Sequence, residues 1–112
     1  TAHFTPLTAF MCTYIDKHIF EKISLDSLAD DLGYDTYYLT TIFRKDTGCT
    51  IKQYILEKKV TQAKILLEST LMEVQEISDQ LSFPSASYFC TQFKKIAGES
   101  PLSYRKNRNH RR

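Results

Sequence analysis

The residues of this sequence best suited to chemistry are basic side chains that gather toward the C-terminal end. Residues 94–112 hold seven lysines and arginines against a single acid, Glu99, and so carry a net charge of +6. The whole chain of 112 residues carries +2, so the other 93 residues sum to −4. Lysine and arginine clusters bind the phosphates of nucleic acids, but a solvated terminal segment explains the charge equally well.

The other reactive residues do not indicate a catalytic or metal-binding cluster. The histidines are His3, His18 and His110, and the cysteines are Cys12, Cys49 and Cys90. The histidines lie in different segments without a carboxylate or a cysteine at ligand spacing. The cysteines are isolated and odd in number, whereas zinc sites use pairs such as C-x-x-C and disulfide frameworks use even counts. We therefore expect no enzymatic activity, no metal, no cofactor, and reduced cysteines in a cytoplasmic protein.

Length and composition are those of one small globular domain or two very small ones, with 42% hydrophobic and 25% charged residues. No apolar run approaches the roughly 18 residues that a membrane span needs. A charged leader followed by an apolar run is also missing, so secretion is not indicated. Because the sequence begins with Thr1 rather than Met, we expect a fragment or a processed chain, with any further domain before Thr1.

Apolar residues recur at helical spacing along almost the whole chain, and capping residues and glycines divide this pattern into seven helices. The expected helices cover about residues 6–20, 24–32, 35–47, 51–68, 73–81, 85–97 and 101–106. In the first of them, Phe10, Tyr14 and Ile15 form the apolar stripe. Since no segment alternates with period two for long enough to be a strand, the sequence predicts an all-α fold.

The chain also repeats itself. Shifts of 49 and 50 residues align Leu28 with Ile77, Tyr34 with Phe83, Phe43 with Phe93, Arg44-Lys45 with Lys94-Lys95, and Gly48 with Gly98. Each copy is a short helix, a turn of three to four residues and a second helix, which is the helix-turn-helix arrangement. A solenoid of αα-hairpins needs at least three repeats, and the basic pair at the same late position in both second helices favours DNA.

The helix between the two copies has roughly twenty residues and is therefore roughly 30 Å long. Successive major-groove faces on one side of B-DNA lie roughly 34 Å apart, so such a rod suits two recognition helices in adjacent groove segments without dimerisation. We expect a first subdomain at residues 1–49, a linker helix at 50–69, a second subdomain at 70–107 and a basic tail at 108–112.

The stretch 83–105, FPSASYFCTQFKKIAGESPLSYR, resembles the second-half signature of the AraC/XylS family of bacterial transcription regulators. The stretch 28–55, LADDLGYDTYYLTTIFRKDTGCTIKQYI, resembles the corresponding first unit, and the resemblance covers about residues 10–106. It implies a monomeric domain of seven helices, with two helix-turn-helix subdomains joined by a long central helix. It also implies that the second helix of each unit enters the major groove of double-stranded promoter DNA.

Carried onto this chain, the resemblance assigns residues to the DNA contact. The base-facing positions of the first unit are Thr36, Tyr37, Thr40 and Thr41. The groove-facing positions of the second unit are Ser85, Ala86, Ser87, Cys90 and Thr91. Phosphate contacts are expected from Arg44, Lys45, Lys94, Lys95 and Arg105.

Helical geometry distinguishes some of the aromatic residues. Adjacent residues of a helix point about 100° apart, and the positions of Leu39 and Phe43 turn Tyr37 outward rather than Tyr38. Several other aromatic residues occupy apolar helical spacings and are expected in the core rather than as stacking platforms for bases. They are Tyr34, Tyr54, Phe83, Phe89, Phe93 and Tyr104.

Two residues depart from the family pattern. Thr91 stands where arginine is common, so the second unit has no long donor for bidentate reading of guanine. We therefore expect the first unit to read bases and the second to anchor the domain through phosphates and thymine methyl groups. Ser82 replaces the usual glycine before the second turn, where a side chain in the left-handed conformation costs about 1 kcal/mol.

The expected partners are promoter DNA and, as usual in the family, RNA polymerase. The isolated domain is expected to be a monomer, and dimerisation of the full-length protein would depend on a domain before Thr1. The competing hypothesis is a helical protein-interaction module whose basic end is incidental. For Cys90, close approach of a small side chain to DNA is a simpler explanation than a redox switch.

Overall fold

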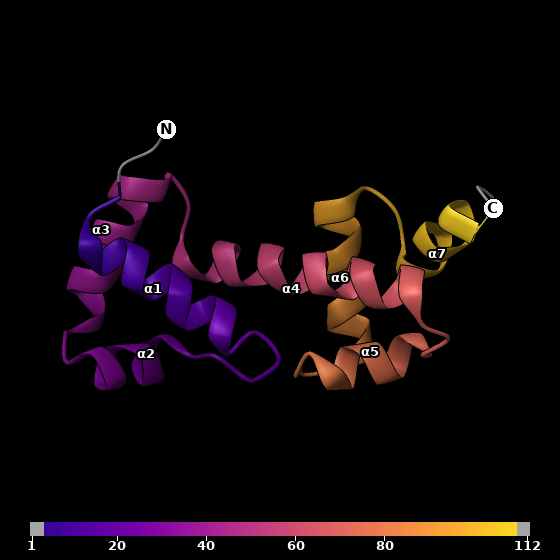
Figure 1. The fold of residues 1–112 in the computed structure, drawn as a ribbon, viewed down its shortest axis with the longest axis horizontal. Coiled ribbons are helices and arrows are strands. Elements are labelled where there is room, and N and C mark those ends of the chain that lie inside the picture. The colour runs from indigo at the N-terminus through magenta and orange to yellow at the C-terminus, as the bar shows by residue number, and fades with distance from the viewer. Residues whose placement is uncertain (1–3, 110–112) are drawn as a thin grey trace. The chain divides into compact units, whose positions relative to one another are not determined.

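The computed structural model describes residues 4–109, and these residues form seven helices and no strand (Figure 1). The helices are α1 (Pro6–Lys17), α2 (Leu25–Leu32), α3 (Thr36–Thr47), α4 (Ile51–Ser69), α5 (Val74–Gln80), α6 (Ala86–Ala97) and α7 (Pro101–Asn109). The predicted all-α fold of seven helices is confirmed. Most of the basic tail at 108–112, with His3 and His110, lies outside the described residues. Within them, no helix is long and apolar enough to span a membrane.

Local capping explains where the helices begin and end. Six residues accept a hydrogen bond from the backbone N–H three positions later: Thr5, Ser24, Asp35, Thr50, Ser85 and Ser100. These residue types satisfy the free N–H groups of a first turn. Helix α5 begins instead with a capping box between Glu73 and Glu76. Helices α2, α3 and α6 each end at a glycine in the left-handed conformation.

The chain divides into two compact units, and the division falls inside α4. Unit 1 contains the chain up to Ile19 together with Ile23–Ile55, and unit 2 contains Phe20–Lys22 and the chain from Leu56 onward. The sequence predicts that all of residues 50–69 form a linker helix between the subdomains. In the structure, the beginning of α4 packs with α1–α3 and the remainder packs with α5–α7.

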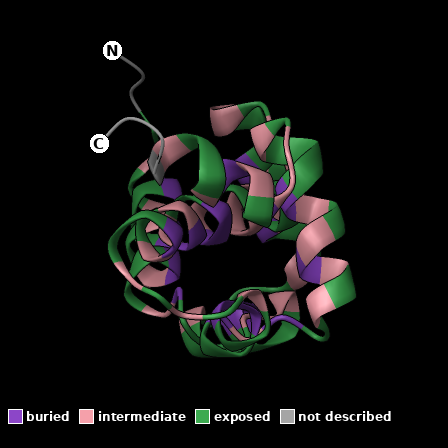
Figure 2. Ribbon diagram, turned by 90° about the vertical axis from the view of Figure 1, so that its right-hand side faces the viewer, coloured by how far each residue is buried: buried purple, intermediate pink, exposed green. Residues whose placement is uncertain are grey.

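The core of unit 1 is formed by the buried apolar residues Met11, Ile15, Ile19, Leu28, Ala29, Leu39, Phe43 and Ile51. The prediction that Phe10 lies on the buried stripe of α1 is wrong, because its side chain is 58% exposed. Met11 and Ile15, four residues apart, define the inward direction, and Phe10 lies about 100° from Met11 around the helix. Figure 2 shows the general pattern, in which buried positions recur among exposed ones on the same helix.

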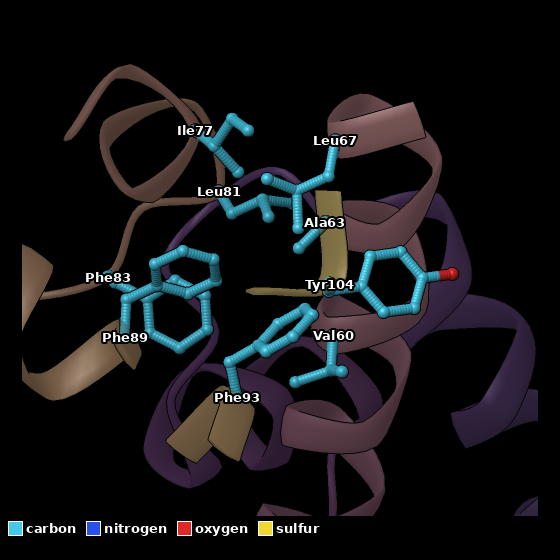
Figure 3. Packing of buried hydrophobic residues seen from close by; sticks show 9 residues of the cluster. All are labelled: Val60, Ala63, Leu67, Ile77, Leu81, Phe83, Phe89, Phe93 and Tyr104. Atoms are coloured by element: carbon cyan, nitrogen blue, oxygen red, sulfur yellow. The ribbon is translucent and has the colours of Figure 1, made fainter. Parts of the chain in front are cut away.

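The core of unit 2 is built around four aromatic rings that come from α6, α7 and the turn before α6 (Figure 3). Phe89 lies with its ring centroid 4.9 Å from that of Phe83 and 5.8 Å from that of Phe93, and Phe93 lies 5.7 Å from Tyr104. The expected burial of these four aromatic residues is confirmed. Aliphatic side chains of α4 and α5 complete the cluster: Val60, Ala63, Leu67, Ile77 and Leu81.

Two polar side chains hold the segment Phe20–Lys22 within unit 2. The Lys59 ammonium, 5% exposed, donates to the carbonyl oxygens of Glu21 at 2.8 Å and Leu81 at 2.6 Å. Burial lowers the pKa of Lys59 to about 8, although the Glu21 carboxylate acts in the opposite direction. Ser82 has the expected left-handed backbone, with φ of 59°, and its hydroxyl donates to the Phe20 carbonyl at 2.7 Å. This hydrogen bond offsets part of the conformational cost of Ser82.

Candidate nucleic-acid interface

Helix α3 presents one exposed face along its length. The face consists of Tyr37, Thr41, Arg44 and Lys45, all exposed. Leu39 and Phe43 are fully buried on the other side of the helix. Tyr37 is 80% exposed and Tyr38 is 47% exposed, so the predicted outward direction of Tyr37 is confirmed. The face therefore runs from an aromatic and a hydroxyl side chain to a basic pair.

Helix α6 presents a matching face in the same register. It consists of Ser87, Thr91, Lys94 and Lys95, all exposed, while Phe89 and Phe93 are fully buried. A shift of 50 residues superimposes this set on the face of α3. The two helices differ in character, because α6 carries serine where α3 carries Tyr37. The Thr91 hydroxyl donates to the Ser87 carbonyl at 3.0 Å, so its hydrogen-bond donor is already used within the helix.

The remaining groove-facing candidates are less accessible or already engaged. Thr36, Thr40, Ala86 and Cys90 are half-buried at the edges of the two faces. Ser85 is exposed, but its hydroxyl caps α6 by accepting a hydrogen bond from the N–H of Tyr88 at 3.0 Å. In each unit, the predicted base-facing or groove-facing residues thus lie on one helix or directly before it. Only some of them are part of the exposed face of that helix.

The prediction that Tyr34 belongs to the core is wrong. Its side chain is 47% exposed and stacks on Tyr38, with ring centroids 5.5 Å apart and an interplanar angle of 21°. The backbone does not explain the difference from Phe83, which is 8% exposed, because both residues donate to the carbonyl five positions earlier. The phenol hydroxyl of Tyr34 explains its greater exposure, because a tyrosine keeps its polar end in water unless a buried partner is supplied.

Arg105 is engaged in the fold of unit 2. Its guanidinium donates through Nε to the Leu67 carbonyl at 3.0 Å and through Nη2 to the Thr70 carbonyl at 3.2 Å. A cation at these carbonyls satisfies acceptors at the end of α4 and complements the negative end of its dipole. Arg108 lies over the Tyr104 ring at 4.2 Å. Part of the basic C-terminal end therefore stabilises the unit itself.

Asp46 positions the basic end of α3. Its Oδ2 accepts hydrogen bonds from the backbone N–H of Thr5 at 3.0 Å and from the Thr5 hydroxyl at 2.9 Å. Hydrogen bonding by the hydroxyl of Thr8, followed by these two bonds from Thr5, holds the pKa of Asp46 below its usual range. The carboxylate thus ties the end of α3, directly after Lys45, to the start of α1.

We also looked at metal-binding and thiol chemistry in the described part of the chain. There, no three His, Cys, Asp or Glu side chains come together as a possible metal site. Cys12, Cys49 and Cys90 are all free thiols. The exposed faces of α3 and α6 remain the clearest candidate surface.

A family model described as a helix-turn-helix domain matches residues 28–107, which include α3, α4 and α6. The chain belongs to the AraC/XylS family of transcription regulators. The match confirms the resemblance of both repeat copies to that family.

Curated relatives agree with this assignment. AdaA of Bacillus subtilis (strain 168), a bifunctional transcriptional activator/DNA repair enzyme, is 37% identical over 92 residues, which are 82% of this chain and 44% of AdaA. The xylose operon regulatory protein of Escherichia coli (strain K12) is 35% identical over 92 residues, 82% of this chain and 24% of that protein. This AraC/XylS chain therefore spans less than half the length of these two relatives.

Solved structures show the same fold. The C-terminal domain of AraT, a response regulator from Geobacillus stearothermophilus, matches with a TM-score of 0.91 and 29% identity over 95% of this chain and 88% of that one. The DNA-binding domain of AdpA, solved in complex with a target DNA, matches with a TM-score of 0.88 and 26% identity over 96% and 97%. The present chain therefore has the fold of these two domains.

Sequence reasoning did not single out Asp46 or Lys59 in this AraC/XylS domain. The partner of Asp46 lies 41 residues away, and the acceptors of Lys59 lie 38 and 22 residues away. Neither residue belongs to a local motif. The one available signal for Lys59 was its place among the apolar residues Val60 and Ala63, which indicates a buried lysine.

Proposed function

We propose that this domain binds double-stranded promoter DNA in a sequence-specific manner by placing α3 and α6 in the major groove. The observation that carries the proposal is the pair of exposed faces in the same register, each ending in two basic residues. In a helix-turn-helix, the N-terminal residues of the second helix contact base edges. Basic residues farther along the helix contact phosphates and set its position.

The two units divide the work of recognition. In unit 1, Tyr37 and Thr41 read bases, with Thr36 and Thr40 at the edge of the contact. In unit 2, the small side chains Ser85, Ala86, Ser87, Cys90 and Thr91 allow close approach and pack on thymine methyl groups. Phosphates are contacted by Arg44, Lys45, Lys94 and Lys95. Arg105 can contribute to phosphate binding only through the donors that it does not direct to α4.

The domain functions within a bacterial transcription regulator in the cytoplasm, and RNA polymerase is its protein partner. The role in transcription is supported by the names of its relatives, which include the transcriptional activators AdaA and AarP. The domain acts as a monomer without catalytic activity. The subdomains proposed at residues 1–49 and 70–107 each supply one recognition helix, and residues 50–69 connect them.

A mobility-shift series with increasing salt tests the proposal. We expect Lys94→Ala and Lys95→Ala to weaken binding to all sequences alike and to reduce the salt slope by about 1 each. Tyr37→Ala and Thr41→Ala should instead change the preference among sites. If no promoter fragment were retarded even at low salt, the proposal would fail. If all four variants behaved alike, the division between reading and anchoring residues would be wrong.

A further inference from the structure

Asp35 places a negative charge at the N-terminal end of the proposed recognition helix of unit 1. The residue is exposed, and its Oδ1 accepts a hydrogen bond from the backbone N–H of Tyr38 at 2.9 Å. This bond caps α3 and fixes the direction of the carboxylate. The other oxygen, Oδ2, accepts no hydrogen bond from a described residue.

Capping does not require this charge. The repeat places Ser85 at the matching position of unit 2, where its hydroxyl accepts a hydrogen bond from the N–H of Tyr88 at 3.0 Å. Serine and aspartate are similarly effective as N-caps. The fold of this chain therefore begins one recognition helix with a neutral cap and the other with an acid. The negative charge of Asp35 interacts favourably with the helix dipole, but the cap itself does not require a charge.

The backbone around Asp35 is held on both sides. Tyr34, directly before it, stacks on Tyr38, three residues after it. The same Tyr38 supplies the N–H that binds the carboxylate. Asp35 is thus presented in one orientation, which is the condition for a specific hydrogen bond to a ligand.

DNA restricts what such a carboxylate can bind. Phosphates repel it, so it opposes the usual attraction between a helix N-terminus and phosphate. In the major groove, guanine and thymine present acceptors, whereas cytosine presents its N4 amino group and adenine its N6 amino group. Adenine places the N7 acceptor beside N6, and a carboxylate disfavours that arrangement. Cytosine is therefore the base that fits.

We propose that Asp35 is a specificity-determining residue whose Oδ2 accepts a hydrogen bond from the N4 amino group of a cytosine in the major groove. The inference rests on the proposed function, in which α3 enters that groove. Asp35 stands at the N-cap of α3, and Tyr37 and Thr41 lie farther along that helix. Its charge excludes guanine and thymine at the contacted position.

Selection of binding sites from a pool of randomised duplexes tests this role. We expect the wild-type chain to select cytosine at one position within the stretch read by unit 1. Asp35→Ser copies the neutral cap of α6, so it should keep the thermal midpoint close to that of the wild type. It should reduce the preference for cytosine at that one position by about tenfold and leave the other positions unchanged.

Asp35→Asn is the matched second variant, because it keeps an acceptor for the cap and removes the charge. With its Oδ1 kept at the cap, the asparagine presents an Nδ2 donor where the aspartate presents Oδ2, so the preferred base should change from cytosine to guanine or thymine, which present acceptors. If both variants selected the wild-type site at every position, Asp35 would be a cap alone and the inference would be overturned, while DNA binding would stand. If the wild-type chain selected no sequence, the proposed function would fall and the inference with it.

Discussion

Ser78 has a buried hydroxyl that the core of unit 2 leaves unsatisfied. The residue is fully buried on α5, and its Oγ has no hydrogen-bond partner among the described residues. The repeat places Ala29 at the corresponding position of unit 1, where it is 5% exposed. One unit therefore shows that a methyl group suffices where the other buries a hydroxyl.

Ser78→Ala should raise the free energy of unfolding by about 1 kcal/mol, because burial of an unpaired hydroxyl costs about 1–3 kcal/mol. Denaturant unfolding measures the change. The reciprocal substitution Ala29→Ser is the control and should lower the stability of unit 1 by a similar amount. Equal or lower stability of Ser78→Ala would mean that the hydroxyl is satisfied in solution.

Lys59 makes stability depend on pH in an unusual direction. Its pKa of about 8 in the folded chain lies below the ordinary value of 10.5. Between these values, the unfolded chain binds a proton that the folded chain has released, so this group makes stability rise with pH. We expect the rise to be clearest from pH 8 to 10. Above pH 10 the raised pKa values of Tyr54 and Tyr104 act in the opposite direction.

Lys59→Met isolates this contribution, because methionine has a similar length and does not titrate. The variant should lose the rise in unfolding free energy between pH 8 and 10, whatever its stability at pH 7. Unfolding in denaturant at several pH values gives the comparison. A wild-type curve parallel to that of the variant would show that the buried ammonium keeps an ordinary pKa.

Helix ends and helix sides differ in how far the sequence predicts them. Caps and stops are local, so Thr5, Ser24 and Gly33 marked the true boundaries. The side of a helix that becomes buried depends on distant residues, which is why the expectations for Phe10 and Tyr34 were wrong. The same holds for the candidate site. Its helices and register were predictable from the repeat, whereas the engagement of particular donors was not.

Arg105 shows this limit, because only the structure reveals its bonds to the end of α4. Arg105→Met should remove both hydrogen bonds and lower the free energy of unfolding by about 1–2 kcal/mol.

The effect of Arg105→Met on DNA binding distinguishes a structural role of Arg105 from a phosphate contact. A purely structural Arg105 leaves the salt slope unchanged, whereas a phosphate contact reduces the slope by about 1 when it is lost. Because Arg105 keeps donors that are not directed to α4, the proposed phosphate contact predicts the reduced slope.

Lys106→Met is the matched control on the same helix, since Lys106 is exposed. Its stability should remain within about 0.5 kcal/mol of the wild type. If both variants lost the same stability, the bonds of Arg105 to the Leu67 and Thr70 carbonyls would contribute nothing, and the basic character of α7 would be the common cause.

The molecule as a whole carries two helices, α3 and α6, that follow one repeated plan and differ in their exposed faces. The face of α3 offers Tyr37, and Asp35 stands at its start. The face of α6 offers Thr91, whose hydroxyl is bonded to the Ser87 carbonyl. Under the proposed function, unit 1 supplies most of the sequence preference and both units supply affinity. The number of bases that the domain reads should therefore grow when α6 receives a long donor.

Thr91→Arg supplies that donor at an exposed position whose neighbours remain in place. An arginine there can pair with both O6 and N7 of guanine, which is worth about 1–3 kcal/mol of discrimination. We expect a new guanine in the selected site, outside the stretch read by unit 1, with the preferences of unit 1 unchanged. Thr91→Met, long but without donors, should select no guanine. An equal rise in affinity for all sequences with a steeper salt slope would instead place position 91 beside phosphates, contrary to the orientation of α6 proposed above.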